Sequence, residues 1–419
     1  MATERYHKMN TTLLINPTAF EAGLLSSASA TGLTGAREAA WAAFAQTGLP
    51  HRRLEAWKWT DLRAALREPL AQAPANDVIA PSPFDGFEIA LLNSAAQWSG
   101  DAPEGVEITS VAAEAAAPCA LASDHPLANL VCALTTDVVH IAVAGGRDIG
   151  RPLLIRHVAG AGQAHARILI DVGDGAQVSI IETFEGPPSS GGDAYFSNSF
   201  TEARLGAGAR LTRSALQEGD ASGVEANLFA ATLGAEAHVE QTALAFGGKA
   251  VRLETRLAYE GDGAGATLNS AAMLSGARHA DVTSHIAHHA EGCVTRQTHK
   301  SAVKTRGRGV FQGKFYVARG AQKTDADMQA NALLLSDTAE ANHKPELEIY
   351  ADDVECAHGS TAGALDENAL FYLRQRGLDE AAARALLIEA FLGAVIDGVA
   401  DEAVRDIFRA RTARWLEDA

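Results

Sequence analysis

The 419-residue sequence is poor in cysteine, in aromatic residues and in positive charge. Its four cysteines, Cys119, Cys132, Cys293 and Cys356, show no CxxC spacing. They predict neither a disulfide framework nor a closed zinc site, and they fit a reducing cytoplasm. The formal net charge of -17 excludes a broad surface for nucleic acid or for an anionic membrane, because both need concentrated Lys and Arg. We therefore expect protein partners, no nucleic acid and no membrane.

Long apolar runs and nucleotide motifs are also missing. Nowhere do about eighteen uncharged apolar residues follow one another, and the N-terminal "MATERYHKMNTTLLINPTAF" has no signal-peptide core. There is no GxxxxGK[ST] loop, no GxGxxG between a strand and a helix, and no GxSxG, HExxH or kinase set. We expect a cytoplasmic protein that is not an autonomous nucleotide-driven enzyme.

What the chain does contain is enough apolar material for a packed protein, with 47% hydrophobic and 21% charged residues. Its length favours two or three domains unless the fold is elongated. The patterns divide it into an N-terminal helical domain with a linker (1–85, linker around 71–83), a β core with its lead-in segment (86–360, regular from about 137) and a C-terminal helical domain (361–419).

The N-terminal part combines one helix with a tryptophan-rich segment. "GAREAAWAAFAQTGLP" has apolar residues at helical spacing, followed by Gly48 and Pro50 as stop signals. The next segment, "HRRLEAWKWTDL", carries Trp57 and Trp59. Two tryptophans this close favour an element anchored on the core, with a ligand-stacking role as the alternative.

From about residue 137, short β-type segments alternate with glycine-containing corners. Aligning "GDGAQV", "GAGARL", "GAEAHV", "GAGATL", "AEGCVT" and "ARGAQK" places the third corner residues at 175, 208, 236, 265, 292 and 320. A repeat of this kind is typical of a solenoid, and the β-branched, alternating segments favour strands. We expect a mainly β protein with a parallel β-helix of two strands per repeat. A β-sandwich is the alternative.

Beyond residue 361 the pattern becomes helical. Asp366 can cap a helix through "ENALFYLRQR" that ends at Gly377, and Asp379 can cap a second one. A last helix is expected around 401–416. The apolar stripe predicted for the second helix consists of Leu386, Leu387, Ala390, Phe391, Ala394 and Val395.

Two segments contain ligand-type residues. "SHIAHHAEGC" holds the densest cluster, in which His285 and His289 would share a strand face with Cys293 while His288 opposes them. Zinc or iron could use such residues, but structural histidines are the competing interpretation.

"DDVECAHGST" (352–361) places Cys356 and His358 two residues apart, on one face of an extended strand. They could form a reactive or metal-binding pair, or be a small buried thiol beside a surface imidazole. Val354 shares their strand parity. The spacing alone leaves these alternatives open.

The run "AQKTDADMQANALLLSDTAEANHKPELEIYADDVECAHGSTAGALDENALFYLRQRGL" closely resembles the C-terminal core of SufD-type members of the SufB/SufD family. These are non-ATPase scaffold subunits of the SUF iron–sulfur assembly system. The upstream "GLPHRRLEAWKWTDL" resembles the family's N-terminal signature, so the likeness spans most of the chain.

The resemblance implies a right-handed parallel β-helix between helical domains, pairing with SufB through the β-helix and with the ATPase SufC through the C-terminal helices. The family's Cys-x-His falls on Cys356 and His358, which would share a transient nascent cluster and its iron with SufB. It implies a non-catalytic scaffold with no permanently bound cofactor and with ATP only on SufC. The alternatives are a SufB-type subunit and a purely structural, protein-binding β-solenoid.

Overall fold

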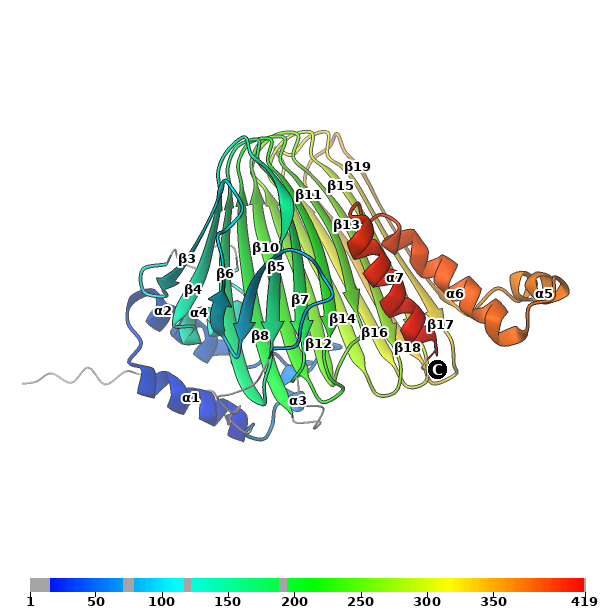
Figure 1. Cartoon of the computed structure of the whole chain (residues 1–419), viewed down its shortest axis with the longest axis horizontal. Coiled ribbons are helices and arrows are strands. Elements are labelled where there is room, and N and C mark those ends of the chain that lie inside the picture. Colours follow the sequence, from blue (N-terminus) through cyan, green and yellow to red (C-terminus); the bar gives the residue numbers. More distant parts are fainter. Residues whose placement is uncertain (1–15, 71–78, 117–121, 188–193, 418–419) are drawn as a thin grey trace, which may run out of the picture.

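The computed structural model describes residues 16–70, 79–116, 122–187 and 194–417. Within them, the chain forms a β-solenoid from two sheets, one of ten strands and one of nine (Figure 1). From β4 onward, even-numbered strands join the nine-stranded sheet and odd-numbered strands the ten-stranded sheet, so each turn adds one strand to each. Successive turns pair in parallel, which confirms the predicted parallel solenoid and excludes the antiparallel β-sandwich.

The bounds of the elements follow from the backbone hydrogen bonds. The strands are β1 Phe87–Leu92, β2 Ala95–Trp98, β3 Val106–Ala112, β4 Asp137–Val143, β5 Asp148–Val158, β6 Gly162–Val172, β7 Gln177–Glu185, β8 Tyr195–Leu205, β9 Arg210–Glu218, β10 Val224–Leu233, β11 His238–Ala245, β12 Ala250–Tyr259, β13 Gly265–Leu274, β14 His279–His288, β15 Val294–Val303, β16 Arg308–Val317, β17 Asp325–Leu334, β18 Glu340–Ile349 and β19 Glu355–Gly363. The helices are α1 Ala19–Thr31, α2 Gly35–Thr47, the 3-10 helix η1 Glu55–Trp57, α3 Leu62–Ala65, α4 Pro126–Leu134, α5 Glu367–Gln375, α6 Glu380–Ile396 and α7 Glu402–Glu417.

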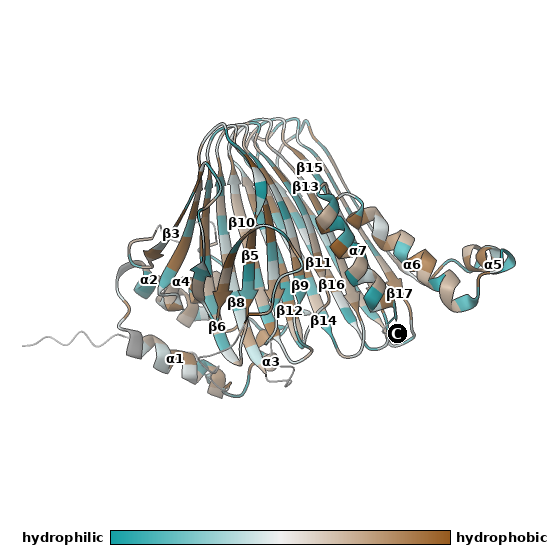
Figure 2. Ribbon diagram, viewed as in Figure 1, coloured by the Kyte–Doolittle hydropathy of each residue, from teal (hydrophilic) through white to brown (hydrophobic). Residues whose placement is uncertain are grey.

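The interior of the solenoid is filled by every second residue of each strand. One turn advances the chain by between 26 residues (Val224 to Ala250) and 33 (Val178 to Leu211). Side chains one turn apart therefore stack in columns, of which Val178, Leu211 and Val239 form one, each at most 3% exposed. Figure 2 shows hydrophobic and hydrophilic residues interspersed along the strands, as this alternation requires.

One set of corners, leading from the nine-stranded to the ten-stranded sheet, needs a left-handed backbone. Its φ values lie between 58° and 69°, at Gly175, Gly208, Glu236, Gly263, Gly292 and Lys323. The amides of these residues donate to the next corner, as Gly175 does to Ala207 O at 2.8 Å. The alignment of the sequence is therefore wrong at two corners, which lie at 263 instead of 265 and at 323 instead of 320. Gly265 is already the first residue of β13. Lys323 adopts the left-handed conformation although it has a Cβ atom, which makes that conformation less favourable than it is for glycine.

The two ends of the solenoid differ. At the N-terminal end, β2 and β3 pair antiparallel with β1 and β4, so the first parallel strands have neighbours on both sides. At the C-terminal end, β18 and β19 are the last strands of their sheets. No further strand of the described residues covers their outer edges.

The N-terminal helices cover the outer face of the nine-stranded sheet. α1, α2 and α4 share a core with Phe196, Val224 and Ala226 of that sheet. The predicted helix at the N-terminus is confirmed as α2. Its buried face is formed by Trp41, Phe44 and Ala45.

Trp57 anchors the tryptophan-rich segment on this face. Its ring, 4% exposed, packs under the Arg252 guanidinium at 4.0 Å and beside His125. Arg252 also donates to Ala56 O at 2.7 Å and pairs with the fully buried Asp281. This arrangement favours the anchoring interpretation over ligand stacking, because the face of the ring is already occupied.

The C-terminal helices cover the outer face of the ten-stranded sheet. α6 and α7 bury Leu392, Val395 and Phe408 against residues such as Leu244 and Met273 (Figure 1). The predicted caps at Asp366 and Asp379 are confirmed, as is a last helix. The predicted stripe of α6 is wrong in part: its buried positions are Ala383, Ile388, Leu392, Val395 and Ile396.

A buried ionic group interrupts the apolar interior. Glu182, 1% exposed, lies 2.8 Å from His157 Nε2 and accepts hydrogen bonds from Thr201 and Arg213. Burial by itself would raise the pKa of this carboxyl, but Arg213 and His157 outweigh it and hold the pKa at about 2.

Three expectations from the sequence concern other parts. Cys132 is disulfide-bonded, whereas Cys293 and Cys356 are free, so a single bonded cysteine among the described residues stands beside the expectation of no disulfide framework. No helix in the described part of the chain is long and apolar enough to cross a membrane. Cys119 and most of the predicted linker, residues 71–78, lie outside the described residues. The boundaries between the three predicted domains stay predictions.

We predict that Trp57→Ala lowers the free energy of unfolding by about 3–5 kcal/mol, because it empties a packed site and removes the ring beneath Arg252. Trp59→Ala is the matched control. Trp59 is only half-buried, with Lys58 over its ring, so we expect about 1 kcal/mol or less. Denaturant unfolding followed by circular dichroism measures both, and equal losses would contradict the anchor.

We also predict that Glu182→Gln destabilises the protein at neutral pH by about 3–5 kcal/mol, since it leaves Arg213 buried without its charge partner. The folded-state pKa of Glu182 lies below the ordinary 4.5, so its ionisation stabilises the fold above pH 4.5. That contribution disappears as the pH falls from 4.5 towards about 2. The difference in free energy of unfolding between Glu182→Gln and the wild type should therefore decrease over this pH range. Denaturant unfolding at a series of pH values measures it. Parallel curves would refute the assignment.

Candidate functional site

The open C-terminal end of the solenoid is formed by β18 and β19. β19 pairs only with β17, and β18 pairs only with β16, among the described strands. One edge of each strand therefore presents backbone N–H and C=O groups that no strand in the described part of the chain pairs with. Such an edge is a template for a strand of another chain.

Cys356 and His358 lie on the inward face of this last turn. In the register of β19 on β17, Cys356 stands over Ala326 and His358 over Met328. Both of the residues beneath are buried in the interior core, at 1% and 0% exposure. The prediction that Cys356 and His358 share a strand face is thus confirmed, and that face is the interior of the solenoid. Only the absence of a further turn leaves His358 exposed and Cys356 half-buried.

The Cys356 thiol has a raised pKa in the isolated chain, which favours its protonated form. Burial is the main cause that raises its pKa above 9.0, and the charge of Asp325 adds to it, while a hydrogen bond from the Ala326 backbone acts in the opposite direction. A thiolate is the form that binds metal and attacks electrophiles. Conversion of this thiol to a ligand therefore needs a cation, and no cation of the described residues acts on its pKa.

His343 is a residue of this end that the sequence reasoning missed. It stands over Phe311 in the register of β18 on β16, and so faces the interior as well. Its Nδ1 lies 3.0 Å from Ser360 Oγ of β19, a contact that joins the two sheets across the open end. Its Nε2 is buried without a hydrogen-bond partner among the described residues. His343 and Leu347 are four residues apart and therefore lie on the same face of a strand. This spacing was the signal in the sequence that could have placed His343 in the interior.

Acidic side chains surround the start of β19. Asp352, Asp353 and Glu355 are exposed, and no cation of the described residues forms an ion pair with them. The Glu355 amide donates to Thr324 O at 2.9 Å, which fixes the corner that leads into the strand. Arg296 lies near enough to Glu355 to interact with its charge, but no ion pair of the described residues neutralises these three acids. Their negative charge favours a cation or a basic segment of a partner at this end.

The histidine cluster of "SHIAHHAEGC" does not converge on one point. His288 is buried and lies 2.9 Å from Thr295 Oγ1, while its Nδ1 is 3.2 Å from Tyr316 O. His285 faces a polar hollow on the outer side, and Cys293 lies at a corner beyond the end of β14. No group of three His, Cys, Asp or Glu able to hold a metal occurs among the described residues. The structural interpretation is therefore the better one for these residues.

A second surface of interest is formed by α5 and the outer side of α6, which we call the helical surface and define by Phe371, Tyr372, Leu386, Ala390 and Ala394. α5 projects away from the sheets at one end of the molecule (Figure 1). Phe371 is 64% exposed, Tyr372 57% and Leu386 45%. Three of these residues belong to the stripe that the sequence predicted to be buried. α6 therefore has one apolar side on the solenoid and another in solvent.

Comparisons with known proteins agree with this architecture. The family model described as "SUF system FeS cluster assembly, SufBD core domain" matches residues 155–391, a range that includes Cys356 and His358. The chain is 30% identical over 400 residues to the iron–sulfur cluster assembly protein SufD of Escherichia coli (strain K12), covering 88% of this chain and 90% of the relative.

Two further relatives are described as iron–sulfur cluster assembly SufBD family proteins. One, from Synechocystis sp. (strain ATCC 27184 / PCC 6803 / Kazusa), is 28% identical over 84% of each chain. The other, from Mycobacterium tuberculosis (strain ATCC 25618 / H37Rv), is 26% identical over 88% of this chain and 90% of the relative. The family match covers more than half of the sequence, and the fold agrees with the one that the resemblance implied. The chain therefore belongs to the SufBD family of iron–sulfur cluster assembly proteins.

Proposed function

We propose that this chain is a non-catalytic, SufD-type scaffold subunit that pairs with SufB through the open end of its solenoid. The observation that carries this proposal is the position of Cys356 and His358 on an interior face that no further turn of this chain covers. A solenoid needs a cap or a neighbour at each end to complete its core. A partner solenoid that supplies the next strands would bury both side chains at the junction.

The nascent iron–sulfur cluster is the cargo of this junction. Clusters are commonly held by about four ligands, mostly cysteine thiolates. Cys356 and His358 can offer two, and SufB would provide the remainder together with the positive charge that lowers the pKa of the thiol. A shared and incomplete ligand shell suits transient assembly and release, so we expect no permanently bound cofactor.

The ATPase SufC would bind the helical surface. Phe371, Tyr372 and Leu386 offer exposed aromatic and aliphatic side chains, of the kind that fill pockets at protein interfaces. ATP would bind only to SufC, and the complex would work in the cytoplasm. The alternatives are a SufB-type subunit and a purely structural solenoid without a role in the cluster.

We predict that His358→Ala reduces the iron and sulfide bound per SufB–SufC–SufD complex while folding and SufB pairing stay nearly unchanged, because an exposed imidazole adds little to the core. Cys356→Ser should reduce cluster content less if His358 is the principal ligand. Anaerobic co-expression, size exclusion and iron and sulfide analysis of the complex provide the measurement.

Val354→Ala is the matched control for this experiment. Val354 packs on Val317, Ala321 and Ala351 at the same end, so its truncation should weaken stability or pairing without a specific loss of iron and sulfide. Wild-type cluster content in both His358→Ala and the double variant with Cys356→Ser would remove these residues from the site. It would leave the purely structural solenoid as the better interpretation.

We also predict that the combined variant Phe371→Ala, Tyr372→Ala and Leu386→Ala weakens SufC binding by at least about tenfold, since it truncates exposed side chains at the centre of the proposed interface. Arg409→Ala, on the exposed side of the neighbouring α7, is the control and should bind SufC normally. Affinity measured by calorimetry tests the surface directly. Unchanged binding by the triple variant, or by a chain that ends near residue 364, would show that SufC docks elsewhere.

A further inference from the structure

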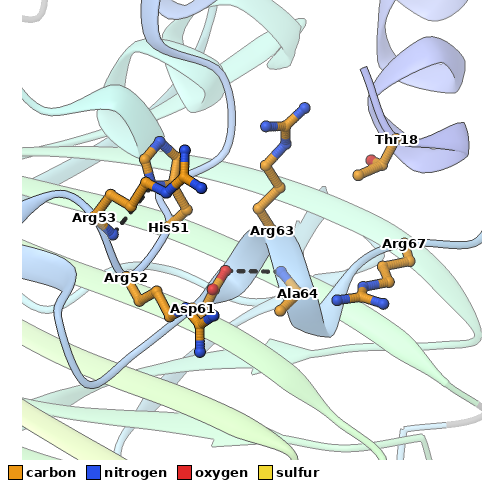
Figure 3. Close-up of a pocket in the computed structure, with 8 residues that line it drawn as sticks. All are labelled: Thr18, His51, Arg52, Arg53, Asp61, Arg63, Ala64 and Arg67. Carbon is orange, nitrogen blue, oxygen red and sulfur yellow. Dashed lines mark hydrogen bonds between the residues drawn. The ribbon is translucent and has the colours of Figure 1, made fainter. Parts of the chain in front are cut away.

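A basic hollow of about 350 Å³ opens between α1, the loop after α2 and α3, on the N-terminal side of the molecule (Figure 3). Its lining contains His51 and four arginines, Arg52, Arg53, Arg63 and Arg67. The whole chain has a net charge of -17, so this concentration of positive charge runs against the composition.

The walls of the hollow are fixed by one buried carboxylate. Glu21 of α1 is fully buried and accepts hydrogen bonds from the backbone amides of Thr18 and Leu49 at 2.8 and 3.0 Å. It also pairs with Arg63 Nε at 3.1 Å. Thr18, Leu49 and Arg63 come from the three segments that surround the hollow. The hollow is therefore held in shape without a ligand. The positive charge of Arg63 is neutralised by Glu21 in this arrangement.

Three guanidinium groups remain available. Among the described residues, no hydrogen bond or ion pair engages the side chains of Arg52, Arg53 and Arg67. Asp61 is the carboxylate in the lining, and its Oδ1 accepts the Ala64 amide at 2.8 Å as the cap of α3. In Figure 3, Arg53 and Arg67 extend from opposite sides of the opening. The hollow thus keeps an excess of positive charge.

His51 adds a further donor. The backbone amide of Arg53 donates to His51 Nδ1 at 3.2 Å, so a neutral ring carries its proton on Nε2. Guanidinium and imidazole N–H groups together form a set of donors without apolar surroundings. Such a set matches an oxyanion with several acceptor oxygens.

We propose that this hollow binds the phosphate groups of a small anion, with a diphosphate as the minimal ligand. Arginine recognises phosphate with paired N–H donors, and a multiply charged anion gains most from several cations at once. A volume of about 350 Å³ exceeds that of one phosphate and lies at the lower end of small-molecule sites.

The lining also argues against a nucleoside as part of the recognised group. Among the described residues that line it, Ala64 is the only aliphatic one, and none is a tryptophan, tyrosine or phenylalanine on which a base could stack. With a volume of about 350 Å³, the hollow is too small to follow a nucleic-acid backbone. We therefore expect the phosphates alone to account for binding, so that ATP binds no more tightly than pyrophosphate.

The test is calorimetric titration of the full-length chain with pyrophosphate in a low-salt buffer, with inorganic phosphate, ATP and malonate as parallel ligands. We expect pyrophosphate to bind more tightly than inorganic phosphate or the dicarboxylate malonate. Arg53→Gln combined with Arg67→Gln should weaken pyrophosphate binding by at least about tenfold, because each removes a charged donor from an exposed position that the fold does not need. A thermal melt of each variant confirms folding.

Two further variants make the test specific. Arg147→Gln combined with Arg151→Gln removes two exposed, paired arginines elsewhere and should leave pyrophosphate binding unchanged. Asp61→Asn keeps the cap of α3 but removes the negative charge from the hollow, so it should tighten binding. No pyrophosphate binding by the wild type, equal loss in the control, weaker binding by Asp61→Asn, or tighter binding of malonate or ATP would each overturn the proposal.

Discussion

The requirement that each turn of a parallel β-ladder has a neighbour on both sides governs this protein. Pairing with a neighbouring strand satisfies the backbone N–H and C=O groups, and the next turn buries the inward side chains. A terminal turn therefore lacks hydrogen-bond partners along one edge and cover for its inward side chains. The N-terminal end meets the requirement with the antiparallel strands β2 and β3. The C-terminal end does not, and the residues with metal-binding chemistry lie there. The incomplete ladder and the partial ligand shell that we propose thus occur at one place.

The same constraint explains which parts of the fold the sequence could predict. Alternating β-branched segments and recurring corners predict a solenoid because each turn repeats the same burial problem. The positions of two corners were wrong because the left-handed conformation does not require glycine. "GDGAGA" offers three glycines for one site, and Lys323 fills another without being glycine. Corner geometry is enforced by hydrogen bonds between turns, which local sequence does not contain.

Helix faces show a different limit. The apolar residues of α6 are numerous enough for two stripes, and the sequence cannot tell which one the sheet will cover. The stripe of Ile388, Leu392 and Val395 is buried, while Leu386 stays in solvent. Likewise, strand parity predicted that Cys356 and His358 share a face, but not that His343 would meet Ser360 from the other sheet. That contact depends on how two residues seventeen positions apart, on strands of different sheets, are brought together across the interior.

The arrangement also connects the two proposed docking surfaces through few steps. α6 packs on β13 and β15, and Lys300 of β15 lies 4.4 Å from the centre of the Phe391 ring of α6. β15 pairs along its length with β17, and β17 pairs with β19, which carries Cys356 and His358. A displacement of the helical surface therefore has only two ladders to cross before it reaches the open end. Backbone ladders are stiff and the interior is close-packed. A rigid shift of the last turns therefore costs less free energy than a local deformation of one strand when the helical surface is displaced. Such a shift would act on the edge that we propose for SufB, where both partial ligands lie.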